Sequence, residues 1–118
     1  MRFLQCKRYK KDLKEIKKAC HEENLDRKIC EEIGAILVLR PDFPACCAPL
    51  RSFEGFKLFK LRVSACGKGK SGGLRVIFAY EEQENLVILI RVYRKSDREN
   101  MTEEEIVENF IHCLENPD

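Results

Sequence analysis

The N-terminal third of the chain contains two stretches in which apolar residues recur every three or four positions. This is the period of a helix that buries one face. In the first stretch, lysine and glutamate separate four such positions: Tyr9, Leu13, Ile16 and Cys20. A second helix is predicted over residues 23–39, where prolines at 41 and 44 end it. A short strand is expected ahead of both helices, at residues 2–6.

Three later segments have the composition of strands. Residues 56–63 alternate between apolar and polar positions, and residues 74–80 and 86–94 are rich in β-branched and aromatic side chains. A last helix is predicted to begin after Thr102, which can form a capping box with Glu105.

The resulting order of elements is β-α-α-β-β-β-α, with residues 41–55 expected to form a loop. This order predicts a single α+β domain over residues 1–118. We expect an antiparallel sheet of about four strands with a mixed edge. Two N-terminal helices should pack on one face of it, and a C-terminal helix should complete the fold.

Alternation along the strands separates an apolar set of side chains from a basic set. The apolar set should pack on the N-terminal helices: Phe59, Leu61, Val63, Leu74, Val76, Phe78, Tyr80, Ile88, Ile90 and Val92. The opposite face should carry Lys60, Arg62, Arg75, Arg91, Tyr93 and Lys95. An ordinary solvated face mixes both signs of charge, whereas the segment 57–80 contains six basic residues and no acid. Clustered like charges repel unless an anion neutralises them. This face is therefore predicted to bind an anion, and a phosphodiester backbone suits it best.

The overall charge hides a strong asymmetry. All 22 Lys and Arg lie in residues 1–98 together with 13 acids, a net of +9, whereas residues 99–118 carry seven acids and no base, a net of −7. A basic body favours a polyanionic partner. The acidic end either shields the basic surface or is a solvated helix face.

The seven cysteines do not form a metal-binding pattern. None are paired as CxxC, and His21 and His112 are the two histidines. We therefore expect no metal, no cofactor, and free thiols that pack as small apolar groups in a reducing compartment. The chain has no long apolar run and no signal-peptide pattern, so a cytoplasmic protein without a membrane partner is expected.

The glycine-rich segment at residues 66–73 is not a nucleotide-binding loop. The glycine that a Walker A motif requires is replaced by Ser64, and a strand follows where that motif opens a helix. A flexible hairpin connection explains the glycines. Its lysines, Lys68 and Lys70, can still touch a nucleic-acid backbone.

The segments GKGKSGGLRVIFAY (67–80) and LVILIRVYRKSDRENMT (86–102), followed by an acidic amphipathic helix, resemble the RelE/ParE toxin superfamily. The similarity is greatest to its HigB-like, phage-related branch, and Tyr9, Lys11, Asp12 and Leu13 fit the first helix of such toxins. It covers most of the chain and is weak at residues 20–56. The family fold agrees with the predicted order of elements.

The resemblance implies a toxin of a type II toxin–antitoxin system. RelE- and HigB-like members cleave mRNA in the ribosomal decoding site, so the expected partners are a cognate antitoxin, the ribosome and mRNA, with a possible toxin–antitoxin hetero-oligomer. ParE-like members instead inhibit DNA gyrase, which is one alternative. The other is an inactive homologue that acts as a binding partner or corepressor.

The basic strands and the resemblance together give a predicted site for a metal-independent endoribonuclease. Its catalytic residues are Arg75, Lys60, Lys95 and Tyr93. Its RNA-binding residues are Arg62, Lys68, Lys70, Arg91, Arg94 and Lys57. The expected reaction is attack of a 2′-hydroxyl on the adjacent phosphate, with Arg75 stabilising the charge that develops on phosphorus. Several RelE-type nucleases carry Tyr or His where this chain has Asn100, Met101 and Thr102, so the acid and the base are not assigned.

Overall fold

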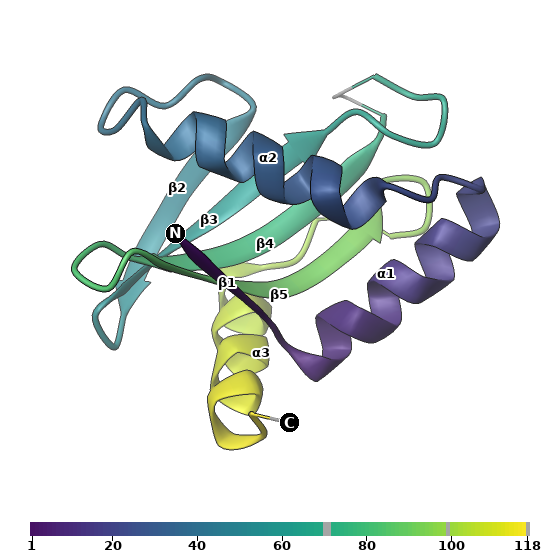
Figure 1. Cartoon of the computed structure of the whole chain (residues 1–118). Helices are drawn as coiled ribbons and strands as arrows, with labels where there is room; N and C mark the ends of the chain where they lie inside the picture. The colour runs from purple at the N-terminus through teal and green to yellow at the C-terminus, as the bar shows by residue number, and fades with distance from the viewer. Residues whose placement is uncertain (70–71, 99, 118) are drawn as a thin grey trace.

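A computed structural model describes residues 1–69, 72–98 and 100–117. In this part of the chain, a five-stranded sheet is flanked by three helices (Figure 1). The elements follow one another as β1 (Arg2–Gln5), α1 (Lys7–Cys20), α2 (Leu25–Leu37), β2 (Cys47–Phe53), β3 (Phe56–Val63), β4 (Leu74–Glu81), β5 (Leu86–Arg94) and α3 (Glu103–Glu115). The strand order is β1-β5-β4-β3-β2, with β1 parallel to β5 and the other neighbours antiparallel. The α+β class and the mixed edge are as expected.

One strand lies where the sequence predicts a loop. β2 pairs with β3 at the edge of the sheet, and its register is interrupted between Pro49 and Ser52. A proline cannot donate a hydrogen bond within a sheet, so it is confined to edges and bulges. Because β2 is an irregular edge strand with a mostly exposed burial pattern, it lacks the apolar alternation by which strands are predicted.

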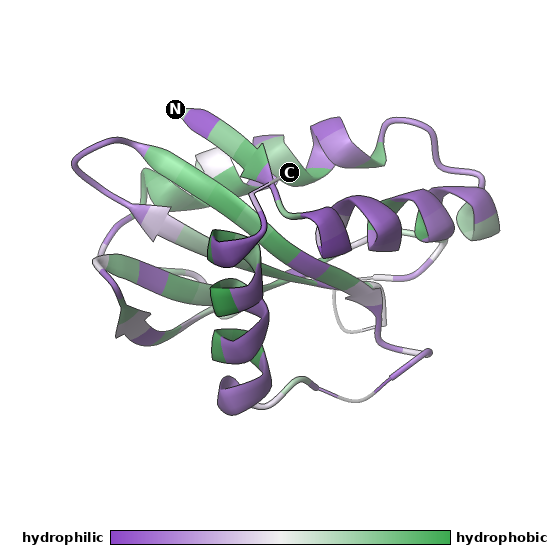
Figure 2. Ribbon diagram, turned by 90° about the horizontal axis from the view of Figure 1, so that it is seen from below, coloured by the Kyte–Doolittle hydropathy of each residue, from purple (hydrophilic) through white to green (hydrophobic). Residues whose placement is uncertain are grey.

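The sheet has helices on both sides. α1 and α2 lie on one side, and α3 lies on the other (Figures 1 and 2). The apolar stripes of the first two helices are buried in one core with the sheet: Tyr9, Leu13 and Ile16 from α1, and Leu25, Ile29, Ile33, Ile36 and Leu37 from α2. No helix in the described ranges is long and apolar enough to cross a membrane.

A bulge in β5 changes which of its side chains face the core. Ile77 pairs with Arg91 but Phe78 pairs with Leu89, so Ile90 is an extra residue in β5. Upstream of this bulge the alternation is inverted. Ile88 pairs with Ala79 and therefore lies on the side of α3, whereas the strict alternation assumed above places it on the side of α2.

α3 covers the apolar end of that second face. Leu58, Ala79 and Ile88 are cross-strand neighbours there, and Phe110 of α3 packs edge-on against Phe53 and Phe56 at 6.0 and 5.2 Å between ring centroids. Beyond this end, the same face carries the cationic side chains of β3 and β4. One side of the sheet is thus divided into a packed apolar end and a basic end.

The expectation that all seven cysteines are free thiols is wrong. Cys6 is bonded to Cys113, and Cys20 is bonded to Cys66. Three cysteines take part in no disulfide: Cys30, Cys46 and Cys47. The bonded cysteines lie 107 and 46 residues apart, so spacing in the sequence gave no sign of the pairing.

Candidate nucleic-acid interface

Three functional side chains form one row across the basic end of the sheet. Arg62 of β3 lies directly opposite Arg75 of β4, which in turn lies opposite Tyr93 of β5. Directly opposed residues in antiparallel strands share a face, with Cβ atoms about 4.5–5.5 Å apart. Lys60 lies in the adjacent row on the same face, opposite Ile77. The sheet therefore brings together four of the predicted site residues.

The residue just before β4, the strand that carries Arg75, occupies a position where only glycine fits. A Cβ atom on Gly73 would overlap the Val63 carbonyl oxygen, and it would also lie 3.0 Å from Ala65 N and Gly69 O. The Gly73 carbonyl accepts a hydrogen bond from Lys95 N at 3.0 Å. This close approach sets the ends of β3, β4 and β5 beside one another, and it fixes the backbone two residues ahead of Arg75.

Arg75 is a buried cation. Its side chain is 6% exposed, and Nη1 donates to the Leu74 carbonyl oxygen at 3.3 Å. Burial, and then the positive charge of Arg62, lower the pKa of the Arg75 guanidinium from its ordinary value. Because arginine stays protonated in proteins, the outcome is a destabilised positive charge rather than a neutral group. A bound anion would relieve that cost.

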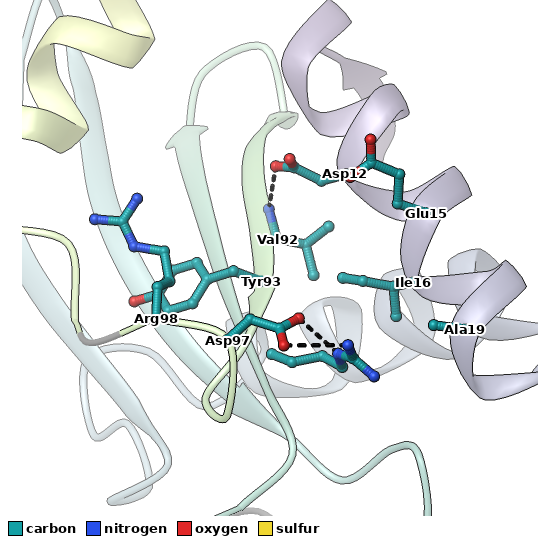
Figure 3. Close-up of a pocket in the computed structure, with 9 residues that line it drawn as sticks. Asp12, Glu15, Ile16, Ala19, Val92, Tyr93, Asp97 and Arg98 are labelled. Carbon is teal, nitrogen blue, oxygen red and sulfur yellow. Dashed lines mark hydrogen bonds and ion pairs between the residues drawn. The ribbon is translucent and has the colours of Figure 1, made fainter.

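Tyr93 is fixed by contacts with the segment that leads into α3. Its hydroxyl oxygen accepts a hydrogen bond from Met101 N at 3.2 Å, and the Arg98 guanidinium lies over its ring at 5.4 Å from the centroid (Figure 3). Since that contact uses an acceptor site of the oxygen, the hydroxyl proton is free to be donated elsewhere.

Arg98 belongs to this site although the sequence did not predict it. It also bonds Glu105 Oε2 at 3.0 Å, which ties it to the first turn of α3. It follows the last strand in an irregular segment, so strand alternation could not assign it to a face. The signal that was present is its position five residues after Tyr93 within a cationic run. We name the set Lys60, Arg62, Arg75, Tyr93 and Arg98 the basic face.

Lys60 and Arg62 have no carboxylate within ion-pair distance among the described residues. Arg62 Nη2 donates to the Ala45 carbonyl oxygen at 2.9 Å, and both side chains are half-buried. Arg62 is held in place by this hydrogen bond, and both cations keep donors that a ligand can use.

Arg91 is occupied by structural contacts. Its guanidinium makes two hydrogen bonds to the carboxylate of Asp12, at 2.6 and 3.0 Å, and a third to Asn109 Oδ1 at 3.2 Å. Asp12 also accepts from Val92 N, at the part of the β5 edge that β1 does not cover (Figure 3). The predicted RNA-binding role of Arg91 would require this pair to open.

The other predicted cations lie around the basic face or away from it. Arg94 donates two hydrogen bonds to Asp97, at 2.7 and 3.1 Å. Lys57 is exposed at the far end of β3, where it lines a groove on the side of α2 with Phe43 and Phe59. Lys68 and Lys95 are exposed in the turns at the near end of the sheet, and Lys70 lies outside the described residues.

A hollow of about 410 Å³ adjoins the basic face between α1 and the end of β5. Figure 3 shows Asp12, Glu15 and Ile16 on its α1 wall, with Tyr93, Asp97 and Arg98 opposite. The described residues include no group of three or more His, Cys, Asp or Glu placed to hold a metal ion. What the site offers to a ligand is guanidinium, ammonium and phenol groups, which bind and polarise phosphate oxygens.

The comparisons with known proteins agree with this architecture. The chain resembles the solution structure of the conserved hypothetical protein HP0892 from Helicobacter pylori, with a TM-score of 0.54 and 21% identity over 82% of this chain and 97% of that one. It also resembles the archaeal RelE–RelB complex from Pyrococcus horikoshii OT3, with a TM-score of 0.52 and 18% identity over the same shares. These likenesses concern the fold alone. No curated protein sequence matches the chain significantly.

A family model gives the assignment that the folds alone do not. The model of the RelE toxin of the RelE/RelB toxin–antitoxin system matches residues 52–111. That range is half of the chain, and it includes all of the basic face and most of α3. The chain therefore belongs to the RelE toxin family.

Proposed function

We propose that this protein is the toxin of a type II toxin–antitoxin pair, of the HigB-like branch, and that it inhibits translation by cutting mRNA on the ribosome without a metal ion. The observation that carries the proposal is the row Arg62, Arg75 and Tyr93 across three strands. It sets a buried cation between a second cation and a phenol, which is an arrangement suited to a phosphodiester.

The proposed reaction begins with attack of an RNA 2′-hydroxyl on the adjacent phosphate. Arg75 binds two phosphate oxygens with its planar fork and stabilises the charge that develops on them. Lys60, Arg62 and Lys95 position the strand. Tyr93 donates its proton to the leaving oxygen, since its hydroxyl oxygen is already oriented by Met101 N. A lysine of the site serves as the base that removes the 2′-hydroxyl proton.

The proposed partners follow from the same surface. The similar archaeal structure is a RelE–RelB complex, which supports a cognate antitoxin for this chain and a toxin–antitoxin hetero-oligomer. An acidic segment of that antitoxin would cover the basic face or displace α3, which already lies on the adjoining apolar end. The ribosome and mRNA are the proposed targets of the free toxin.

The test is cleavage of mRNA by purified toxin added to translating ribosomes, with new 5′ ends mapped by primer extension. Wild-type protein should produce new ends, and Arg75→Ala should lower the cleavage rate by about 10²–10³-fold, the range for losing one transition-state donor. Because Arg75 is buried, its removal could also affect folding. Lys60→Ala is therefore a second variant, since the Lys60 side chain has no partner among the described residues. Arg51→Ala on the exposed edge strand β2 is the matched control and should cleave normally.

Two outcomes would contradict the proposal. If wild-type protein makes no new ends and instead inhibits supercoiling by gyrase, the protein acts as ParE-like toxins do. If its overexpression causes no growth defect and no new ends appear, it is an inactive homologue that acts as a binding partner or corepressor.

A further inference from the structure

Both disulfides begin at α1, one at each of its ends. Cys6 is the residue before the helix and is bonded to Cys113 in α3, whereas Cys20 is its last residue and is bonded to Cys66. Cys66 lies in a tight turn, Ala65 to Lys68, in the connection between β3 and β4. α1 is therefore covalently joined to two elements that adjoin the basic face.

The two disulfides differ in the solvent exposure of their cysteines. Cys20, Cys66 and Cys113 are all partly exposed, whereas Cys6 is 4% exposed and belongs to the hydrophobic core. Thiol exchange requires in-line approach of a thiolate to one sulfur of the disulfide. A thiolate can therefore approach either sulfur of the Cys20–Cys66 bond, but only the Cys113 sulfur of the other bond.

The surroundings of the Cys20–Cys66 bond favour its cleavage in one direction. Arg94 Nη1 lies 3.9 Å from Cys20 Sγ, and a neighbouring cation stabilises a thiolate. Cys66 instead lies beside an acid, because its backbone N–H donates to Glu22 Oε1 at 3.4 Å. Negative charge is therefore favoured on the Cys20 sulfur and disfavoured on the Cys66 sulfur, which makes Cys20 the better leaving group.

We propose that Cys20–Cys66 is a thiol-exchange site whose reaction partner is a dithiol reductant, and that the intact disulfide is the form in which the basic face binds RNA best. A thiolate of the dithiol attacks Cys66 Sγ, a mixed disulfide forms, and Cys20 leaves as a thiolate beside Arg94. The second thiol of the reductant, as its thiolate, then attacks the reductant sulfur that is bonded to Cys66. This bond breaks, and the Cys66 thiolate is released. The protein gains two electrons and two protons, and the dithiol becomes a cyclic disulfide.

Contacts on both sides connect the Cys20–Cys66 bond to the basic face. Arg94 holds Asp97 in the turn that leads to Arg98, and Arg98 lies over Tyr93. On the other side, Cys66 lies three residues after the end of β3, the strand that carries Lys60 and Arg62. An intact bond thus restrains both turns that flank the row, and restraint lowers the entropic cost of binding. This inference rests on the proposed function, because the disulfide would regulate RNA binding by the basic face.

The test begins with the oxidised full-length protein and graded dithiothreitol. Free thiols are trapped with iodoacetamide at each step and assigned by peptide mass spectrometry, while affinity for a short single-stranded RNA is measured in parallel. We expect Cys20 and Cys66 to be alkylated together, at lower dithiothreitol than Cys6 and Cys113. RNA affinity should fall about threefold or more at that step, and it should recover on reoxidation. Arg94→Gln should slow the first reduction.

Variants separate this bond from the other one. The pair Cys20→Ser with Cys66→Ser should bind RNA as weakly as the reduced protein and should no longer respond to dithiothreitol. The matched pair Cys6→Ser with Cys113→Ser, and the free-thiol control Cys30→Ser, should keep the response. If a serine pair does not fold, recovery of wild-type affinity on reoxidation decides the question.

The inference is overturned if Cys6–Cys113 is reduced first, or if reduction of Cys20–Cys66 leaves RNA affinity unchanged. Its failure is distinguishable from failure of the proposed function. A toxin that cuts mRNA on ribosomes equally well in both redox forms refutes the inference alone. A protein that never cuts mRNA but whose RNA affinity follows the disulfide refutes the proposed function alone.

Discussion

Tyr93 is both a proposed catalytic residue and a contact that positions the segment leading into α3. Its side chain is 7% exposed, its ring carries the Arg98 guanidinium, and its hydroxyl holds Met101 N just ahead of α3. A phenol so placed can stack, donate a proton, or do both. Stacking requires only the ring, whereas proton donation also requires the hydroxyl group.

Tyr93→Phe should separate these roles. The ring and its stacking with Arg98 are kept, so the free energy of unfolding should fall by about 1–3 kcal/mol, the cost of leaving the buried Met101 N without its acceptor. If the hydroxyl donates the proton, the single-turnover cleavage rate should fall about 100-fold or more. Single-turnover kinetics with RNA-programmed ribosomes measure this, and thermal melts report the folding cost. A rate within twofold of wild type would show that Tyr93 serves only to stack or to pack.

Strand alternation predicted most of the basic face but could not identify a cation that is held in a long-range ion pair. Lys60, Arg62, Arg75 and Tyr93 share a face as expected. Arg91 was assigned to the same face from the same evidence, yet it bonds a carboxylate 79 residues away in the sequence. A contact of that range leaves no local trace, and a single sequence gives no way to find it.

At the scale of elements, α3 begins as its sequence predicts. Thr102 Oγ1 accepts from Glu105 N at 3.1 Å, and Glu105 Oε1 accepts from Thr102 N at 2.9 Å, which completes the capping box. Local signals of this kind depend only on residues three positions apart. By contrast, β2 and the bulge in β5 depend on pairing with other strands, and the sequence did not predict them.

The start of α3 should be sensitive to acid. The backbone hydrogen bond with Thr102, and then the hydrogen bond with Arg98, lower the pKa of the Glu105 carboxyl. A lowered pKa in the folded state means that the carboxylate stabilises the fold above the pKa of an unfolded glutamate. That contribution is lost as the pH falls through the lower, folded value.

Urea unfolding of wild type and Glu105→Gln across the acid range measures this effect. Wild type should be the more stable protein at neutral pH, and the difference should shrink as the pH falls below the ordinary glutamate range. Glu104→Gln, an exposed neighbour in the same turn, is the control and should show a smaller pH-dependent difference. A difference between wild type and Glu105→Gln that does not vary with pH would contradict the assignment.

At the scale of the whole molecule, a polar network joins α1, β5 and α3. Asn109 Oδ1 accepts from Arg8 of α1 at 2.9 Å and from Arg91 of β5 at 3.2 Å, while Asn109 Nδ2 donates to the Glu105 carbonyl oxygen at 2.8 Å. Asp12 adds two further bonds to Arg91. The helices on opposite sides of the sheet are therefore linked around the edge of β5 and not only through the core.

Removing Asp12 should uncouple this network. Asp12 and Arg91 are 14% and 24% exposed, so the pair is partly shielded from solvent. Asp12→Ala leaves the Arg91 charge and Val92 N without their acceptor, and it should lower the free energy of unfolding by about 1–3 kcal/mol. The matched control is Glu31→Ala, which removes the exposed pair with Arg27 and should cost about 0–0.5 kcal/mol. Equal losses in the two variants, measured by chemical denaturation, would contradict this account.

The extra residue at Ile90 has a consequence for how this protein can vary. Ile88 and Tyr93 are five positions apart, yet the extra residue places them on the same face of the sheet. Ile88 faces α3 there, and Tyr93 lies opposite Arg75. Deleting Ile90 would leave Arg91 opposite Ile77 and Leu89 opposite Phe78, so the other side chains of β5 would keep their present faces. Loss of one residue should therefore be tolerated at this bulge, whereas gain of one residue elsewhere in β5 would move the side chains beyond it to the opposite face of the sheet.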